Sequence, residues 1–274
     1  MSAHFTPDEK VLEIHRRLAH AYGDIRWRSS SDPLCELVRT ILSQNTNDHN
    51  RDLAFERLRA QFPTWKAVRD APAEKVIQAI RPAGLAPSKG PRIQKILQRL
   101  TEERGELSLE FLRELPLAEA RAWLTGLNGV GPKTAAIVLL FSLDRPAFPV
   151  DTHIHRVTRR LGLIPPRTSR EKAHALLAKI VPPELYYPFH IEIIEHGRRV
   201  CAARQPRCES CILRDLCNHY QGAKTYDQQS TQTISVVDLS NAGLPLAGPG
   251  LLADSRRRRA VVGLRAKKTT GDAR

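Results

Sequence analysis

The stretch GLNGVGPKTAAIVLL, residues 126–140, predicts the local structure on which our interpretation of the whole chain rests. Gly129 and Gly131 permit the positive φ angles of a sharp turn, and Pro132 favours the first turn of a helix. An apolar run follows the proline. We therefore expect two helices joined by a tight turn.

The backbone N–H groups of this turn favour an anionic ligand. Between Val130 and Thr134 they would lie at the positive end of a helix dipole, where a phosphate binds without any contact to a base. A tight turn without a ligand would use the same glycines. A formal net charge of +14 and a pI near 10 support the phosphate, although an inert basic surface would carry the same charge.

Lys133 stands at the start of the second helix, before an almost wholly apolar run from Thr134 to Leu140. An apolar wall and a helix N-terminus both favour the neutral amine that a nucleophile requires. A lysine that only pairs with a phosphate would occupy the same position. The spacing alone leaves both roles open.

A second segment, PVDTHIHRVTRRLGL at residues 149–163, places Asp151 where it can cap a helix. A helix, a crossing loop and a return would bring the helix starts at Lys133 and Asp151 together, so that a carboxylate faces the amine. A purely structural cap is the ordinary role of an aspartate at this position.

Four cysteines within 17 residues predict a metal site. Their spacing is C-x6-C-x2-C-x5-C, and the N-terminus has no signal peptide, so we expect a cytosolic protein without structural disulfides. Four-thiolate zinc and a [4Fe–4S] cluster both fit this pattern. Cys35, alone on an apolar helix face, is expected to be a core residue. The candidate ligands are Cys201, Cys208, Cys211 and Cys217.

The rest of the chain is predicted to be almost entirely α-helical and free of membrane spans. Leu, Ala, Arg, Glu and Lys recur at helical spacing, and strand-favouring runs are few. We expect helices from Thr6 to Gly23, from Asp151 to Arg160 and from Ser169 to Ile180, and another from Pro188 into the cysteines. Residues 223–274 are polar, Gly/Pro-rich and basic.

Three motifs, in this order and at these intervals, resemble the endonuclease III branch of the helix-hairpin-helix DNA glycosylases: LNGVGPKTA, VDTHIHRV and the four-cysteine loop. The resemblance covers roughly residues 5–222. It implies an all-α, two-lobed fold with a helix-hairpin-helix motif and a C-terminal [4Fe–4S] cluster loop. The expected parts are a helical bundle with the hairpin at residues 30–145, a second lobe with the cluster loop at residues 1–29 plus 146–222, and a flexible basic tail at residues 223–274.

The resemblance also implies an activity, the removal of oxidised pyrimidines from damaged double-stranded DNA. Lys133 matches the lysine that attacks the sugar and forms a Schiff base, and Asp151 matches the aspartate that assists it. Subsequent β-elimination would cut the strand. By the same resemblance we expect a monomer in the cytoplasm, associated with the nucleoid. The hairpin residues expected to bind DNA are Gly129, Val130, Gly131 and Thr134.

Two loops resemble those that fill the gap left by an extruded base. Leu85, in AGLAPSK, matches an intercalating leucine, and Asp48, after SQNTN, matches a base-pocket aspartate. Ungapped alignment puts Asn45 at the position of the family's wedge glutamine, whereas a shift of one residue puts Gln44 there. In the cysteine loop, Arg204 and Arg207 are expected to contact the DNA backbone.

Two alternatives remain at this point. A monofunctional glycosylase acting on mismatched adenine, thymine or uracil would share the fold, but such relatives generally lack a lysine at position 133. A non-catalytic DNA-binding relative could keep the hairpin and the cluster. The pair Lys133 and Asp151 argues against it, while the altered SQNTND loop keeps it open.

Overall fold

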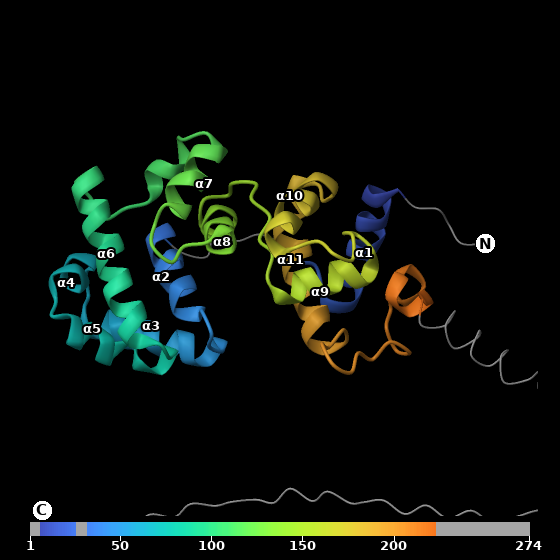
Figure 1. The fold of residues 1–274 in the computed structure, drawn as a ribbon, viewed down its shortest axis with the longest axis horizontal. Helices are drawn as coiled ribbons and strands as arrows, with labels where there is room; N and C mark the ends of the chain where they lie inside the picture. Colours follow the sequence, from blue (N-terminus) through green and yellow to red (C-terminus); the bar gives the residue numbers. More distant parts are fainter. Residues whose placement is uncertain (1–5, 26–31, 223–274) are drawn as a thin grey trace, which may run out of the picture. The chain divides into compact units, whose positions relative to one another are not determined.

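The computed structural model describes residues 6–25 and 32–222, which all belong to one compact unit. Within these ranges the chain is helical and contains no strand, as the sequence predicts (Figure 1). The basic tail, residues 223–274, lies outside the described residues. The α-helices are α1 (Pro7–Tyr22), α2 (Pro33–Ser43), α3 (Asp48–Gln61), α4 (Trp65–Asp70), α5 (Ala73–Ala79), α6 (Ala86–Arg104), α7 (Leu117–Thr125), α8 (Pro132–Ser142), α9 (Thr152–Leu161), α10 (Arg170–Ile180) and α11 (Tyr186–Arg199).

Short 3-10 turns complete the fold at Arg81–Ala83 (η1), Glu110–Arg113 (η2), Pro183–Leu185 (η3) and Arg214–Leu216 (η4). Within the part of the chain that the structure describes, no helix combines the length and the apolar composition needed to cross a membrane.

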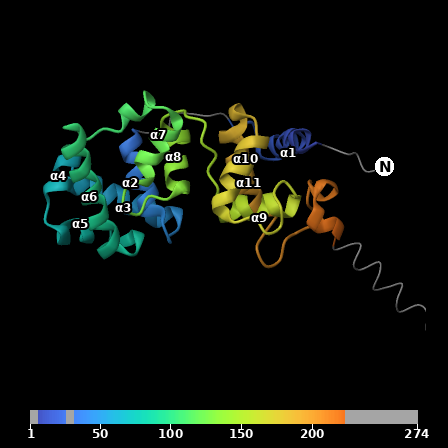
Figure 2. The same ribbon diagram turned by 45° about the horizontal axis from the view of Figure 1, so that its top comes forward.

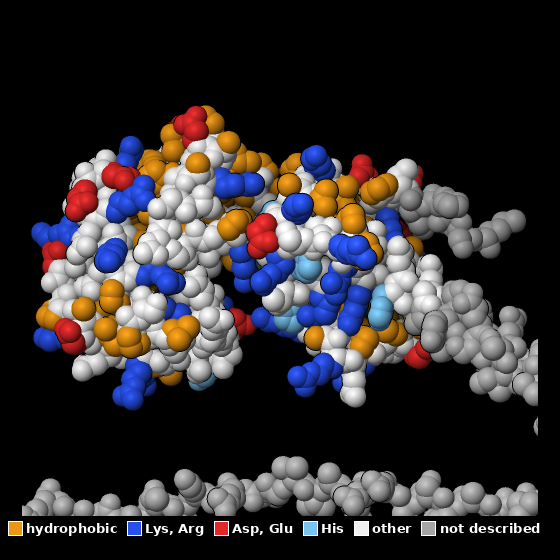
Figure 3. Space-filling view, viewed as in Figure 1, with side chains coloured by type: hydrophobic (Ala, Val, Ile, Leu, Met, Phe, Trp, Pro, Cys, Tyr) orange, Lys and Arg blue, Asp and Glu red, His pale blue; other side chains and the backbone are white. Residues whose placement is uncertain are grey.

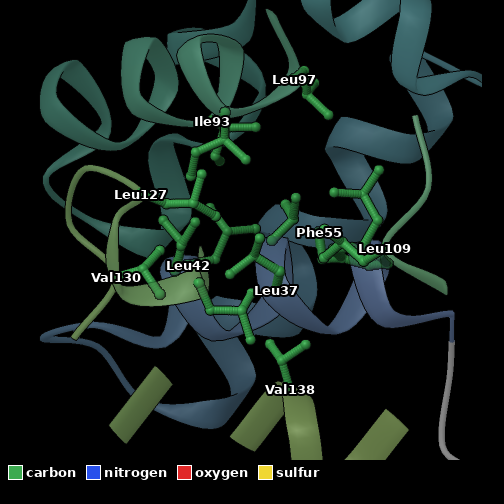
Figure 4. Close-up of a cluster of buried hydrophobic side chains, with 14 of the residues drawn as sticks. Leu37, Leu42, Phe55, Ile93, Leu97, Leu109, Leu127, Val130 and Val138 are labelled. Atoms are coloured by element: carbon green, nitrogen blue, oxygen red, sulfur yellow. The ribbon is translucent and has the colours of Figure 1, made fainter. Parts of the chain in front are cut away.

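One hydrophobic core is built from α2 to α8, with α2 packed directly against α8. Figure 4 shows Leu37 of α2, Ile93 of α6 and Val138 of α8 in this core. Leu127 and Val130, which flank the predicted tight turn, are buried in the same cluster. The turn between α7 and α8 is therefore anchored by its own side chains and does not hang free in solvent. Cys35 packs against this core, as expected.

A second core joins α1 to α9, α10 and α11, which Figures 1 and 2 both show beside α1. Phe148 and Phe189 are buried at its centre. Leu140, from the last turns of α8, also belongs to this core. Helix α8 therefore contributes side chains to both hydrophobic cores, and this fixes where its N-terminus can lie.

The helix starts follow the predicted capping signals. Thr6 accepts a hydrogen bond from the backbone of Glu9, whose carboxylate accepts one from the Thr6 backbone in return. Asp151 and Ser169 cap α9 and α10 through their side chains alone, which accept hydrogen bonds from the backbone N–H groups of Ile154 and Lys172. The start of α11 differs from the prediction. The helix begins at Tyr186, and Pro188 lies inside its first turn, where a missing N–H costs nothing because those N–H groups have no helical acceptor.

The tight turn uses only one of its two glycines for a left-handed conformation. Gly129 has φ +78°, but Gly131 is extended at φ −92° and caps α8. The expectation that both glycines adopt positive φ is therefore wrong for Gly131. An added Cβ at Gly129 would overlap the side chain of Arg92, whereas a Cβ at Gly131 would meet nothing within 4 Å.

This difference predicts opposite outcomes for two alanine substitutions in one turn. Gly129→Ala should destabilise the fold by at least about 1–2 kcal/mol, because the left-handed conformation is strained and Arg92 must move. Gly131→Ala should change stability by less than about 0.5 kcal/mol. Thermal unfolding of both variants measures this. Equal losses of stability would contradict the assigned turn.

The carboxyl of Glu192 is fully buried in the second core. Its Oε2 lies 2.8 Å from Nδ1 of His15 on α1, while Oε1 has no hydrogen-bond partner among the described residues. Burial raises the pKa of Glu192, and the hydrogen bond from His15 offsets part of that increase.

Glu192 should therefore make the stability depend on pH. A carboxyl with a raised pKa binds its proton more tightly in the folded chain, so its contribution favours folding at low pH and is lost as the pH rises through the raised pKa. We expect Glu192→Gln to gain stability relative to the unmodified chain as the pH is raised above about 4.5. Chemical unfolding of both proteins across this range tests the sign. A difference independent of pH would show that the group does not titrate as expected.

Candidate active site and nucleic-acid interface

Lys133 and Asp151 line one open pocket of about 440 Å³ between α2, α8, α9 and α11. Both residues also border a neighbouring cavity of about 190 Å³. Lys133 and Asp151, whose helix starts were expected to lie close together, thus line the same two cavities. The residues lining the larger pocket are Glu36, Arg39, Thr40, Ser43, Thr46, Asp48, Arg51, Lys133, Ile137, Phe141, Asp151, Thr152, His153, His190, Ile191, Ile194, Glu195 and Arg198.

Asp151 is half-buried and is held in place by its capping role. Its Oδ1 accepts a hydrogen bond of 2.7 Å from the backbone N–H of Ile154. The same carboxylate therefore serves as the N-cap of α9 and as part of the pocket wall. A cap of this kind fixes the carboxylate without burying it away from a ligand.

Lys133 is exposed at the second position of α8, which corrects the expectation that an apolar wall desolvates it. The small residues that follow it, Ala135 and Ala136, turn into the first core. Of the other residues of α8, Ile137 and Phe141 line the same pocket, one and two helical turns further along the same face. The amine is thus reached from solvent, while the pocket becomes apolar along α8.

His190 borders this pocket and was not predicted from the sequence. It is buried on α11, and its Nδ1 donates to the carbonyl of Pro149 across 3.1 Å. Burial lowers the pKa of His190 to about 4, and the charge of Asp151 opposes that shift only in part. The imidazole is therefore neutral at neutral pH. A single histidine in the apolar run PFHIEII is typical of a core residue, so the sequence carries no signal for it.

Helix α2 also presents a polar face to the pocket that the sequence analysis missed. Glu36, Arg39 and Thr40 lie at i, i+3 and i+4, and the Thr40 hydroxyl donates to Glu36 across 3.2 Å. The Arg39 guanidinium is stacked 4.5 Å above the ring of Phe55. Polar residues at this spacing within the apolar segment LCELVRTILS are the signal that could have identified this wall.

Asp48, expected in a base pocket, does line the cavity, and it is paired with two arginines. Its carboxylate lies 2.8 Å from Arg51 and 3.1 Å from Arg198 of α11. These groups are partly exposed, so the pairs contribute little stability. They place two cations at the same rim as Asp48.

The structure narrows the expected phosphate site at the turn. The N–H of Val130 donates to the carbonyl of Leu127 across 3.1 Å, and the Val130 side chain is buried. The side chain of Thr134 is also buried, and Pro132 has no N–H. Of the predicted contacts, the exposed backbone at Gly129 and Gly131 remains available to a phosphate, together with the Lys133 side chain.

The two expected gap-filling loops have unusual backbone conformations. Leu85 has a 57% exposed side chain and a left-handed φ of +51°, and Asn45 has φ +55°. The Gln44 side chain donates to the Gly129 carbonyl across 3.2 Å and accepts from Arg92 across 3.0 Å. Gln44 is thus bound to the α7–α8 turn, while Asn45 lies at the left-handed bend.

The four cysteines line one largely apolar cavity beside α9 and α11. Sγ of Cys201 accepts from Arg160 across 3.3 Å, and Sγ of Cys211 accepts from the Leu213 backbone across 3.4 Å. Burial raises the pKa of Cys208, and it raises the pKa of Cys211 to about 11. A cationic centre would be needed to make thiolates of Cys208 and Cys211 together.

The donor set therefore fits a four-thiolate metal group, although no three His, Cys, Asp or Glu side chains in residues 6–25 and 32–222 are already arranged to bind a single ion. Arg204 and Arg207, between the first two cysteines, are exposed. Both were expected to contact the DNA backbone.

Comparison with known proteins gives a consistent result. Residues 38–183 match the model of the HhH-GPD superfamily base excision DNA repair proteins. Endonuclease III of Thermotoga maritima is 36% identical over 211 residues, which are 77% of this chain and 93% of that protein. A protein of Arabidopsis thaliana with the provisional name of a DNA glycosylase is 42% identical over 166 residues, 61% of this chain, and the match spans only 56% of its length.

Among solved structures, a non-covalent endonuclease III–DNA complex superposes with a TM-score of 0.68 and 29% identity, over 81% of this chain and 100% of the other. The range that the family model matches includes both helix starts of the pocket. The chain therefore belongs to the HhH-GPD superfamily of base excision DNA repair proteins, and within that superfamily it is one of the endonuclease III-like enzymes, the DNA glycosylases and lyases.

Proposed function

We propose that this enzyme removes oxidised pyrimidines from duplex DNA and cuts the resulting abasic strand, with both reactions at the pocket that Lys133 and Asp151 share. The observation that carries the proposal is the convergence of an exposed amine and a fixed carboxylate at the starts of α8 and α9. An amine nucleophile and an adjacent carboxylate are the groups that this chemistry needs.

In the first step, the Lys133 Nζ attacks C1′ of an extruded nucleotide, the C1′–N bond breaks, and the base leaves with its electron pair and gains a proton. Asp151 stabilises the positive charge that develops on the sugar and accepts a proton from the attacking amine. The sugar ring then opens to give a Schiff base. Removal of a C2′ proton and cleavage of the C3′–O bond then cut the strand on the 3′ side. Hydrolysis of the Schiff base releases the enzyme.

The DNA-binding surface of this proposal combines the α7–α8 turn with exposed cations. Figure 3 shows Lys and Arg side chains over much of one face, with many of them around α9 and α11. Gly131 offers its exposed backbone to a phosphate, and Arg204 and Arg207 extend the cationic surface along the cysteine loop. Leu85 supplies an exposed apolar wedge for the gap that an extruded base leaves.

We further propose that Cys201, Cys208, Cys211 and Cys217 hold a [4Fe–4S] cluster, because their spacing is that of the family's cluster loop and their thiols line one cavity. The cluster would hold the loop in shape and would take no part in base removal. Arg160, which donates to the Cys201 sulfur and to the carbonyls of Ala202 and Ala203, fixes the start of that loop from α9.

The nucleophile is tested by borohydride trapping on duplexes that contain one thymine glycol or one abasic site. We expect a covalent protein–DNA band with both, and none with Lys133→Gln. Asp151→Asn should slow base removal by roughly a hundredfold or more, with the fold retained because asparagine also caps helices. Lys179→Gln, at an exposed lysine of α10, is the matched control.

If Lys133→Gln were trapped on DNA as fast as the unmodified enzyme, another amine would be the nucleophile. Base removal without trapping on either duplex would instead support a monofunctional glycosylase.

The cluster is tested by its colour and iron content. Protein purified without oxygen should be brown and contain close to four irons per chain, and Cys211→Ser should lower the iron content and destabilise the loop. A colourless, iron-free preparation that is folded and excises bases would contradict the proposed cluster. Stoichiometric zinc in that preparation would identify the alternative four-thiolate site.

A further inference from the structure

Lys89 of α6 is a lysine enclosed by protein, with only 1% of its surface exposed. Its ammonium donates three hydrogen bonds to backbone carbonyls: 2.8 Å to Leu42, 2.7 Å to Gln44 and 2.9 Å to Ala83. Three protons meet three acceptors, so every donor of the ammonium is used. None of these acceptors is a carboxylate.

The three carbonyls belong to the two segments that carry the expected wedges. Leu42 and Gln44 lie at the C-terminal end of α2, just before Asn45, and Ala83 ends η1, two residues before Leu85. A single ammonium group therefore ties both loops together. Within residues 6–25 and 32–222, the non-glycine residues with positive φ are Asn45, Leu85 and Asp144, and two of these three directly follow segments held by Lys89.

Left-handed backbone at asparagine and leucine costs free energy and persists only where the surroundings enforce it. Burial of the lysine is also unfavourable, since desolvation lowers the pKa of Lys89 and the nearby charge of Arg92 acts in the same direction. A buried leucine or methionine would avoid that cost but could not bind the three carbonyls. The arrangement thus gives up stability to fix the shape of two loops.

The held loops also contact the turn before α8. Arg92, one helical turn after Lys89, donates to the Gln44 side chain, which in turn donates to the Gly129 carbonyl. Lys89 itself does not line the pocket of Lys133 and Asp151. The carbonyls that it binds, at Leu42, Gln44 and Ala83, also belong to residues outside the pocket lining, although Ser43 between the first two is part of that lining. Leu85, beyond Ala83, exposes 57% of its surface.

We propose that Lys89 is a positioning residue that presets both gap-filling loops, so that extrusion of a paired base depends on it while the sugar chemistry does not. The inference rests on the proposed glycosylase and lyase function. A wedge already in its inserted conformation enters the duplex without a further ordering cost. An abasic site has no base to extrude, so its cleavage requires much less from the loops.

The test compares two substrates with one variant. For Lys89→Met, single-turnover excision of thymine glycol should fall about tenfold or more, while cleavage of an abasic duplex should stay within about threefold of the unmodified enzyme. Lys95→Met, an exposed lysine on the same helix, is the matched control and should change neither rate. A fluorescent base analogue opposite the lesion should report slower extrusion in Lys89→Met alone.

A double variant tests whether Lys89 acts through the wedge. Leu85→Ala should reduce lesion excision in the unmodified chain but add little to the loss in Lys89→Met. If Lys89→Met does not fold, Lys89→Gln carries the same comparison, because it keeps two donors but is too short to reach all three carbonyls.

An unchanged ratio of lesion excision to abasic cleavage in the folded variant would overturn the proposal, and so would strictly additive losses. Failure of the unmodified enzyme to trap either substrate would count against the proposed function, not against the role of Lys89.

Discussion

Sharing of α8 between two hydrophobic cores is the constraint on which the site depends. Val138 and Leu139 pack into the core of α2 to α7, whereas Leu140 packs into the core of α1 and α9 to α11. Because one rigid helix belongs to both, its N-terminus cannot move freely relative to the start of α9. Lys133 and Asp151 are the side chains at those two starts. Packing away from the pocket thus positions the two proposed reacting groups.

The charges around the pocket suit a reaction that builds positive charge on a sugar. Asp151 supplies a fixed carboxylate, and the buried His190 behind it stays neutral because desolvation lowers its pKa to about 4. A protonated imidazole at that position would oppose the developing charge and compete for Asp151. The arginines lie at the rim beside Asp48, where a DNA phosphate would pass. In the proposed reaction, Lys133 and Asp151 would meet the sugar inside the pocket, and the rim arginines would meet the backbone.

The features that the sequence predicted correctly are those set by a few adjacent residues. The caps at Thr6 and Asp151 and the left-handed Gly129 depend on local hydrogen bonds and sterics. The exposure of Lys133 could not be predicted from adjacent residues, because most of the apolar residues after it face the cores on other sides of the helix. Lys89 was missed for a related reason, since its three acceptors lie in segments distant in sequence and only tertiary packing shows that they converge.

In the proposed reaction, base extrusion and sugar chemistry depend on partly different contacts. The loops at Asn45 and Leu85 are held by Lys89, and Arg92 links Gln44 to the α7–α8 turn, all outside the pocket that Lys133 lines. The pocket itself is formed by α2, α8, α9 and α11, and Ser43, Thr46 and Asp48 of the SQNTND loop also line it. Substitutions at Gln44 and Asn45, which do not line the pocket, can therefore change how a distorted base pair is sensed without displacing the proposed nucleophile. This separation explains how the altered loop can coexist in one chain with both expected catalytic groups.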